Sequence, residues 1–224
     1  GAILYTINQE NGLQNNTVLA LYESDDGNLW VGMDKGIDLI VLNSSLSFFS
    51  DKNGEIGTVY TAALHQGWLY VGTNRGVFFK SWPGREGERF QLVDGAQGHA
   101  WSLQVRDGQL LCAHNSGTLR IEGEEARALY ATTGAYGFVS VPGREDWILQ
   151  DTYTGLIALR KGRNGEWAYA HDVEGFGMPI SEIVFEGARE LWVAHPRRGV
   201  YHLRLGEGLD TVEVLDTPTA EGLP

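Results

Sequence analysis

The sequence predicts an all-β fold, a β-propeller of about five four-stranded antiparallel blades, from three observations. A short pattern recurs five times: an apolar strand ending in a small residue, a few polar residues, then a glycine. These closing glycines stand at positions 36, 76, 117, 155 and 199, so the period is 38 to 44 residues. No helical periodicity extends over a dozen residues. Glycine (30) far outnumbers proline (6), as expected for many tight turns. A period of about 40 residues made only of strands is typical of propeller blades.

The first repeat spans residues 12–50. Residues 17–23 are apolar without alternation, as expected for a strand covered on both faces by neighbouring blades. Asp26-Gly27 then predicts a hairpin turn, and further strands are expected at 29–32, 37–42 and 46–50. The acidic turn at 25–28 lacks the downstream glutamate of a calcium loop, so a hairpin is the better interpretation.

The later repeats keep this order of strands. They are expected at 57–93, 98–131, 135–172 and 180–216. Residues 217–224 echo the start of the first repeat, and residues 2–7 read as an outer strand. We therefore expect one repeat domain over residues 1–224 that is a segment of a larger propeller array, with 217–224 beginning a further repeat. Five blades can close into a ring or leave an arc that pairs with a second copy.

Two positions recur within the repeats. A small residue ends the second strand of each blade, as Gly32, Gly72, Ala113 and Ala194, and is expected to let adjacent sheets approach closely. In the fourth repeat Gln150 occupies this position and breaks the rule. Four aromatic residues of the second strands are expected in the core, and the closing glycines are expected to have positive φ. These core aromatics are Trp30, Tyr70, Trp147 and Trp192.

Composition excludes several classes of protein. The formal net charge of −12 opposes nucleic-acid binding, which needs clustered cations. The single cysteine, Cys112, lies in an apolar strand and is expected to be buried and inert. No stretch of about 20 apolar residues could span a membrane. The six histidines show no metal-site spacing, so neither a metal nor another cofactor is expected. His114 and His195 occupy equivalent turns and are interpreted as turn residues.

No catalytic motif is present in the sequence. The chain contains neither a Gly-x-Ser-x-Gly elbow nor a phosphate-binding glycine loop, so we expect no enzyme in this chain and no catalytic residue. Paired glycosidase carboxylates are defined by their separation in space. A propeller glycoside hydrolase or lyase therefore stays open as an alternative.

The first repeat resembles a known family. Gly12-Leu13-Gln14-Asn15-Asn16-Thr17-Val18, then Asp26-Gly27-Asn28-Leu29-Trp30-Val31-Gly32 and Gly36-Ile37, is similar to the two-component regulator propeller repeat. The second repeat matches from Gly67 to Val77, whereas later repeats keep only the spacing. Gln14 departs from the family's proline, which returns at Pro224.

This resemblance implies a place in signalling. Such propellers form the extracytoplasmic sensor region of bacterial, Bacteroides-type hybrid two-component histidine kinases, which start a phosphorelay. The expected location is thus the periplasm, as part of an inner-membrane protein without direct membrane insertion of this chain. Kinase and further blades of a parent chain would be its partners, and a homodimer is possible.

The candidate binding residues are aromatic and planar polar side chains. The links between second and third strands and the segments leading into each blade should open on one face of a propeller. Aromatic rings and forked donors there would suit a sugar ring. For Trp101 and Tyr136, packing between blades is an equal alternative, and the arginines could simply pair with surface acids. The candidates are Lys35, Arg75, Trp101, Asn115, Tyr136, Tyr153, Arg197 and Arg198.

The resemblance, together with these candidate residues, implies a ligand-sensing propeller segment of a sensor histidine kinase that responds to an oligosaccharide or a similar ligand. The alternative is a propeller scaffold for protein–protein interaction, and the hydrolase or lyase comes after it.

Overall fold

The computed structural model describes residues 6–9, 12–42, 44, 54–84 and 88–217. Within these residues every regular element is a β-strand, and no helix occurs. The predicted all-β propeller fold is confirmed. The chain divides into two compact units, residues 1–52 and 53–224, which are described separately.

The first unit contains one antiparallel sheet. Its strands follow each other in sequence order. They are β1 (Val18–Glu23), β2 (Leu29–Met33) and β3 (Ile37–Ile40). The predicted fourth strand at 46–50 lies outside the described residues, as does most of the strand expected at 2–7. Residues 6 and 7, which are described, are not in a strand.

The expectation of a core position for Trp30 is wrong in this unit. The small core consists of Leu13, Val31 and Met33, which lie on one face of the sheet. Trp30 points away from them and is 43% exposed, and every residue of β1 is exposed. A single sheet cannot cover both of its own faces, so the apolar pattern of residues 17–23 is not matched by burial within this unit.

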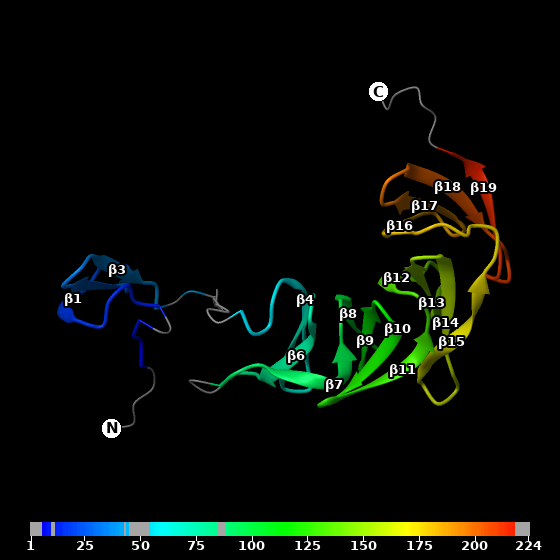
Figure 1. Cartoon of the computed structure of the whole chain (residues 1–224). Helices are drawn as coiled ribbons and strands as arrows, with labels where there is room; N and C mark the ends of the chain where they lie inside the picture. Colours follow the sequence, from blue (N-terminus) through cyan, green and yellow to red (C-terminus); the bar gives the residue numbers. More distant parts are fainter. Residues whose placement is uncertain (1–5, 10–11, 43, 45–53, 85–87, 218–224) are drawn as a thin grey trace. The chain divides into compact units, whose positions relative to one another are not determined.

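The described residues of the second unit form sixteen strands, and their order along the chain can be followed in Figure 1. The second repeat forms β4 (Val59–His65), β5 (Trp68–Thr73), β6 (Gly76–Ser81) and β7 (Gln91–Gln97). The third forms β8 (Ala100–Arg106), β9 (Gln109–His114), β10 (Gly117–Glu122) and β11 (Glu125–Ala131). The fourth forms β12 (Ala135–Val141), β13 (Arg144–Thr152), β14 (Gly155–Lys161) and β15 (Trp167–Val173). The fifth forms β16 (Glu182–Glu186), β17 (Glu190–His195), β18 (Gly199–Leu205) and β19 (Val212–Asp216).

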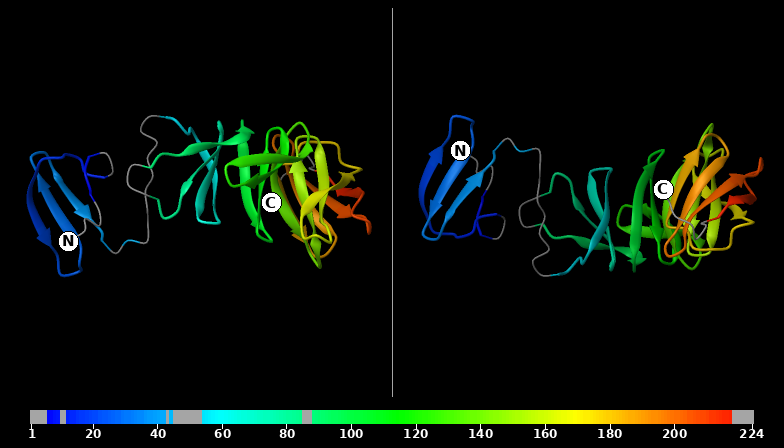
Figure 2. Two further views of the ribbon diagram at one scale, coloured as in Figure 1. Left: turned by 90° about the horizontal axis from the view of Figure 1, so that it is seen from below. Right: turned by 90° about the horizontal axis from the view of Figure 1, so that it is seen from above.

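Each group of four strands is an antiparallel meander, and the sheets follow one another in chain order (Figure 2). The fourth strands of the second and third repeats also touch. Asp94 of β7 pairs in parallel with Glu125 of β11, and the amide of Asp94 donates to the carbonyl of Glu124 at 2.8 Å. This contact joins the two meanders into one eight-stranded sheet.

Successive buried side chains of one strand pack against different neighbouring blades. In β9, Leu110 and Cys112 belong to the cluster shared with the second repeat, whereas Leu111 and Ala113 belong to the cluster shared with the fourth. All four are fully buried, because a sheet lies against each face of the strand. The predicted burial of Cys112 is confirmed, and burial raises the pKa of its thiol.

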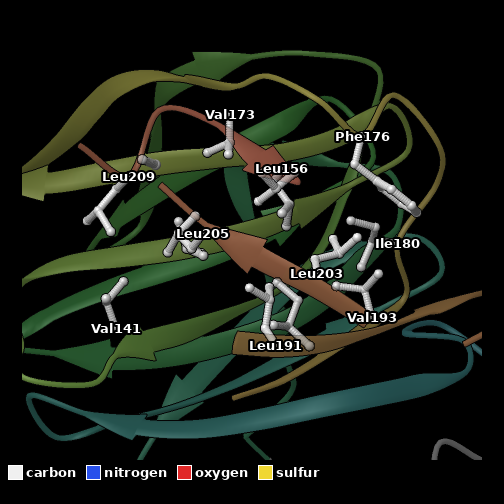
Figure 3. Packing of buried hydrophobic residues seen from close by; sticks show 14 of the residues in the cluster. Val141, Leu156, Val173, Phe176, Ile180, Leu191, Val193, Leu203, Leu205 and Leu209 are labelled. Carbon is white, nitrogen blue, oxygen red and sulfur yellow. The ribbon is translucent and has the colours of Figure 1, made fainter. Parts of the chain in front are cut away.

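The largest apolar cluster lies between the fourth and fifth repeats (Figure 3). Leu156 and Val173 come from the fourth repeat, and Leu191, Val193 and Leu203 from the fifth. These side chains are at most 4% exposed. The cluster therefore packs two separate four-stranded sheets against each other, as expected for neighbouring blades of a propeller.

The closing glycines have positive φ, as predicted, with values between 90° and 157°. Three of them also allow a close backbone approach, and a Cβ on Gly76 would lie 2.7 Å from the carbonyl oxygen of Ala96. A Cβ on Gly117 would lie 2.1 Å from the carbonyl oxygen of Tyr130, and a Cβ on Gly155 would lie 2.4 Å from that of Phe176. No other residue type fits these turns without moving the backbone.

The hairpin register also corrects the alignment of the fourth repeat. The strand residues opposite the closing glycines are His114, Thr152 and His195. The aromatic position three residues earlier is therefore Tyr70, Leu111, Leu149 and Trp192 in successive repeats, and Trp147 does not belong to this set. Tyr70, Leu111 and Leu149 are at most 1% exposed, and Trp147 is partly buried.

Trp192 is 38% exposed, which contradicts the prediction that it is a core residue. The equivalent side chains of the second to fourth repeats are each covered by the next blade in the chain. No described strand follows the fifth blade, so Trp192 stacks only on His202 within its own sheet, with ring centroids 4.2 Å apart.

Candidate ligand-binding site

A cavity of about 380 Å³ lies beside the first strands of the third, fourth and fifth blades. These strands, β8, β12 and β16, are neighbours on one side of the unit (Figure 1). The size falls within the range of small-molecule sites. Its lining residues are Trp101, Ser102 and Gln104 from β8, Tyr136, Gly137, Phe138 and Val139 from β12, Asp151 from β13, and Ser181, Glu182 and Ile183 at β16.

Aromatic rings form one wall of this cavity. Trp101 and Tyr136 line it, with ring centroids 5.5 Å apart. Behind them, Tyr153 lies 4.7 Å from Tyr136 and accepts a 2.7 Å hydrogen bond from the indole nitrogen of Trp101. Tyr60 of the second blade packs on Trp101 at 4.8 Å. The two cavity rings are thus held in place by contacts from the flanking blades.

Gly134 makes room for this arrangement. A Cβ at this residue would lie 2.5 Å from the ring of Tyr153. The carbonyl of Gly134 accepts a hydrogen bond from the amide of Tyr153 at 3.1 Å, which fixes the turn that carries the ring. The position of the aromatic wall therefore depends on a glycine that does not line the cavity.

The polar part of the cavity centres on a buried carboxyl group. In the corrected register, Asp151 is equivalent to Gly72, Ala113 and Ala194, the small residues near the end of the second strand. Asp151, and not Gln150 as predicted, is therefore the exception at this position. Its cross-strand partner is Gly137, whose amide donates a short hydrogen bond to Asp151 Oδ1. The absence of a side chain at Gly137 leaves space for the carboxyl group.

The electrostatic state of Asp151 is unusual. The residue is 5% exposed, and its pKa is raised to about 7, mainly by burial and to a smaller extent by the negative charge of Glu182, against the hydrogen bond from Gly137. Desolvation disfavours the charged form of a carboxyl group. Asp151 is therefore divided between its neutral and ionised forms near neutral pH.

The other polar lining groups come from three strands. Gln104 donates from Nε2 to the carbonyl of Phe138 at 3.2 Å and thereby links β8 to β12. Ser181 Oγ donates to the carbonyl of Ala194 at 3.2 Å. Glu182 is exposed at the cavity edge. No lysine, arginine or histidine is among the residues that line the cavity, all of which the structure describes.

The structure brings together three of the eight predicted binding residues: Trp101 and Tyr136 in the cavity wall, and Tyr153 behind it. The other five do not line the cavity. Arg75 donates from Nη1 to the carbonyls of Gly54 at 2.6 Å and Glu55 at 3.3 Å. It therefore binds the segment that leads into its own blade. Lys35 is exposed in the first unit.

The remaining predicted residues are also exposed. The backbone amide of Asn115 donates to the carbonyl of His99 at 2.9 Å. Arg198 approaches the sulfur of Met178 at 3.6 Å. Arg197 lies in the turn after His195, to which its amide donates at 3.0 Å. These side chains are positioned by their turns, and none is directed into the cavity described above.

Five polar lining residues are absent from the predicted set: Ser102, Gln104, Asp151, Ser181 and Glu182. A signal for one of them exists in the sequence. Gln150, Asp151 and Thr152 are three polar residues in succession at the end of an otherwise apolar strand, and all three are at most 5% exposed. A buried polar group in a core strand is more informative than an exposed charge.

The histidines at equivalent turns have a structural role. Nδ1 of His114 accepts from the amide of Ser116 at 3.2 Å, and Nδ1 of His195 accepts from the amide of Arg197. Thr73 and Thr152 do the same with their hydroxyl oxygens. Among the described residues no group of three or more His, Cys, Asp or Glu side chains could hold a metal ion.

The fold defines a β-propeller, and the comparisons with known proteins agree. Residues 12–35 match the family described as "Two component regulator propeller", so the resemblance of the first repeat is confirmed. No curated protein matches the chain. No helix among the described residues has the length and apolar character needed to cross a membrane.

Two similar solved structures are of the same protein from B. thetaiotaomicron, which their descriptions class differently. One is the extracellular domain of a protein described as a hybrid two-component system, with 17% identity and a TM-score of 0.52 over 91% of this chain. The second is described as the extracellular domain of a one-component system, with 18% identity and a TM-score of 0.52 over 93% of this chain. The chain spans only 31% and 32% of their lengths. At this identity the likeness establishes the fold.

Proposed function

We propose that the chain is the ligand-sensing extracytoplasmic propeller segment of a two-component sensor, and that the cavity beside β8, β12 and β16 binds an oligosaccharide. The family match at residues 12–35 and the similar fold of the B. thetaiotaomicron extracellular domain support the sensor role. In this proposal the chain lies in the periplasm, the kinase of a parent chain carries out the phosphorelay, and this segment has no enzymatic activity of its own.

The observation that carries the binding proposal is the combination of an aromatic wall and convergent polar groups in one cavity. Trp101 and Tyr136 offer apolar faces to the C–H face of a sugar ring. Asp151, Gln104 and Ser102 border the same space and can bond to hydroxyl groups.

The position of the cavity also supports a sensing role. Its walls come from three successive blades, so one ligand would contact all three at once. A ligand shifts a conformational equilibrium only when it binds one arrangement more tightly than the other. A site that spans several blades meets this requirement, because any change in their relative positions alters its contacts.

The test is the binding of a glycan library to the full chain, followed by titration of the best ligand against variants. Trp101→Ala is expected to weaken binding at least about 10-fold, since it removes the ring of the wall. Trp192→Ala is the matched control, because Trp192 is a partly exposed indole of the fifth blade that does not line the cavity. Absence of binding by every glycan, or equal losses in both variants, would contradict the proposal. Release of new reducing ends would indicate the hydrolase alternative.

A second candidate function is the docking of a protein. The specific observation is the apolar face of the fifth blade, where Val184, Trp192 and Val200 are 58%, 38% and 48% exposed. In the fourth blade, Leu149 and Leu156, the equivalents of Trp192 and Val200, are at most 3% exposed. A protein β-sheet is the partner that this face would accept. In that case Trp192→Ala, and not Trp101→Ala, would reduce binding of the partner.

A further inference from the structure

The cavity has an acidic interior, and we propose that it selects oligosaccharides with a free, protonated amine and rejects sugars that carry carboxylate or sulfate groups. This inference rests on the proposed function, because it names the ligand class of the same cavity. It depends on three features: a buried carboxyl group, a second carboxylate on the neighbouring blade, and a lining without cationic side chains.

The first feature is the incomplete pairing of Asp151. Among the described residues, the hydrogen bond that this carboxyl group receives from another residue comes from the amide of Gly137, to Oδ1. Asp151 is 5% exposed, and it borders the cavity. A buried carboxylate is stabilised when it is paired with a cation. An ammonium group in the cavity would supply that cation.

The second feature is the position of Glu182. It pairs across its hairpin with Ala194, just as Gly137 pairs with Asp151. The two carboxyl groups thus occupy the same level of adjacent blades, one on the first strand and the other on the second. Both residues border the cavity, and the charge of Glu182 adds to the effect of burial in raising the pKa of Asp151. An ammonium ion in the cavity that both residues border would be attracted by both carboxylates.

The third feature is the absence of a competing cation. Arg106 on β8 directs its guanidinium to Gln104 Oε1 at 2.7 and 3.1 Å, and it also contacts Ser140 at 2.5 Å. It does not line the cavity. Besides the two carboxyl groups, the titratable side chain that lines the cavity is the phenol of Tyr136. With two carboxyl groups and no lining cation, the cavity would repel a uronate or a sulfate ester.

A neutral sugar is the competing interpretation, in which protonated Asp151 only donates a hydrogen bond to a hydroxyl group. The two interpretations differ in proton balance. An ammonium ion favours the carboxylate form, so an amine ligand would release a proton from the protein near pH 7. A neutral sugar that accepts a hydrogen bond from the carboxylic acid would not release one.

The experiment is calorimetric titration of the full chain at pH 7 with three tetrasaccharides of glucosamine, N-acetylglucosamine and galacturonic acid. We expect the glucosamine tetramer to bind at least about 10-fold more tightly than the N-acetyl form, and the galacturonate to bind weakest. Repetition at pH 6 in two buffers of different ionisation enthalpy should show net proton release on binding of the amine, because the amine is already protonated at this pH and takes up little of the proton that Asp151 loses. Asp151→Asn and Glu182→Gln should each reduce the preference for the amine, whereas Asp94→Asn, at an exposed residue of β7, should not.

The outcomes separate this inference from the proposed function. Binding of the N-acetyl or galacturonate tetramer as tightly as the amine, with loss on Trp101→Ala, would overturn the charge preference and leave the sensing site standing. Amine preference that survives both Asp151→Asn and Glu182→Gln would overturn the assignment to this cavity. Binding of no tetramer would overturn the amine inference, and the glycan library would then decide the proposed function separately.

Discussion

A single exchange of residue size creates the polar centre of the cavity. In the other blades of the second unit the larger side chain of this cross-strand pair lies on the first strand, as in Thr61–Gly72 and Ser102–Ala113. In the fourth blade the order is reversed, with Gly137 on the first strand and Asp151 on the second. The total side-chain volume stays small enough for the sheets to pack, but a carboxyl group becomes buried. The resulting desolvation raises the pKa of Asp151 to about 7.

This residue makes the stability of the protein depend on pH. The ordinary pKa of an aspartate is about 3.9, so between pH 4 and pH 7 the folded state holds a proton that the unfolded state has lost. Stability contributed by this group therefore falls as the pH rises through that window. We expect Asp151→Asn, which keeps an acceptor for the Gly137 amide, to raise the unfolding free energy at pH 8 by about 2 to 4 kcal/mol and to change it little at pH 4.

Urea unfolding at both pH values measures this effect. Asp94→Asn provides the control, because the side chain of Asp94 is exposed and should give the same stability change at both pH values. An equal effect of Asp151→Asn at pH 4 and pH 8 would show that the carboxyl group is not desolvated in the folded protein.

At the scale of the strands, equivalent residues of different blades contribute different amounts to the free energy of unfolding. Leu149 is fully buried between the fourth and fifth blades, whereas its equivalent Trp192 is 38% exposed. We expect Leu149→Ala to lower the unfolding free energy by about 3 kcal/mol, since it leaves a cavity in a packed layer. Trp192→Ala should cost about 1 kcal/mol, because the ring is partly solvated, stacks on His202 and makes one exposed hydrogen bond, from its indole nitrogen to Glu186.

Denaturant titration of the two variants tests this difference. A conservative variant, Leu149→Met, nearly preserves the volume and should cost less than about 1.5 kcal/mol. Equal losses for Leu149→Ala and Trp192→Ala would mean that the open face of the fifth blade is covered in solution, and the exposed area of Trp192 would then belong to an interface.

Sequence patterns identified most strands of the second unit, because inner strands such as 109–113 are apolar on both faces and end in polar turns. The fourth repeat was aligned two residues out of place at its aromatic position. Trp147 resembles the aromatic residue of the other repeats, but the hairpin register places Leu149 there. Residue type alone cannot fix register when a strand is apolar on both faces, since a slip exposes no side chain.

The candidate site was predictable only in part. The aromatic wall follows from residue type, because Trp101, Tyr136 and Tyr153 lie where successive blades begin or turn. The carboxyl group of Asp151 became part of the site through its register opposite Gly137, and Glu182 through the neighbouring blade. Both depend on distances between blades, which a single repeat does not encode. The exposed arginines were favoured for their chemistry, although Arg75, for example, binds its own loop carbonyls.

At the scale of the whole molecule, the two units differ in how much apolar surface they bury. The second unit contains three clusters of fully buried side chains that join successive blades. The described part of the first unit has one sheet and a core of Leu13, Val31 and Met33. Three strands with one small apolar face offer little free energy against the entropy of ordering the chain. Stability should therefore be distributed unevenly along the sequence.

We expect this difference to appear in native-state hydrogen exchange of the full chain. Amides of β2 (Leu29–Met33) should exchange at least about 100-fold faster than those of β9 (Gln109–His114) or β13 (Arg144–Thr152), because the latter strands are sandwiched between sheets and open only when the second unit unfolds. Leu149→Ala should accelerate exchange in β13 and leave β2 unchanged. Equal protection of β2 and β9 would contradict the expectation and would mean that the exposed face with Trp30 is covered in solution, since only burial of that apolar surface could supply the missing stability.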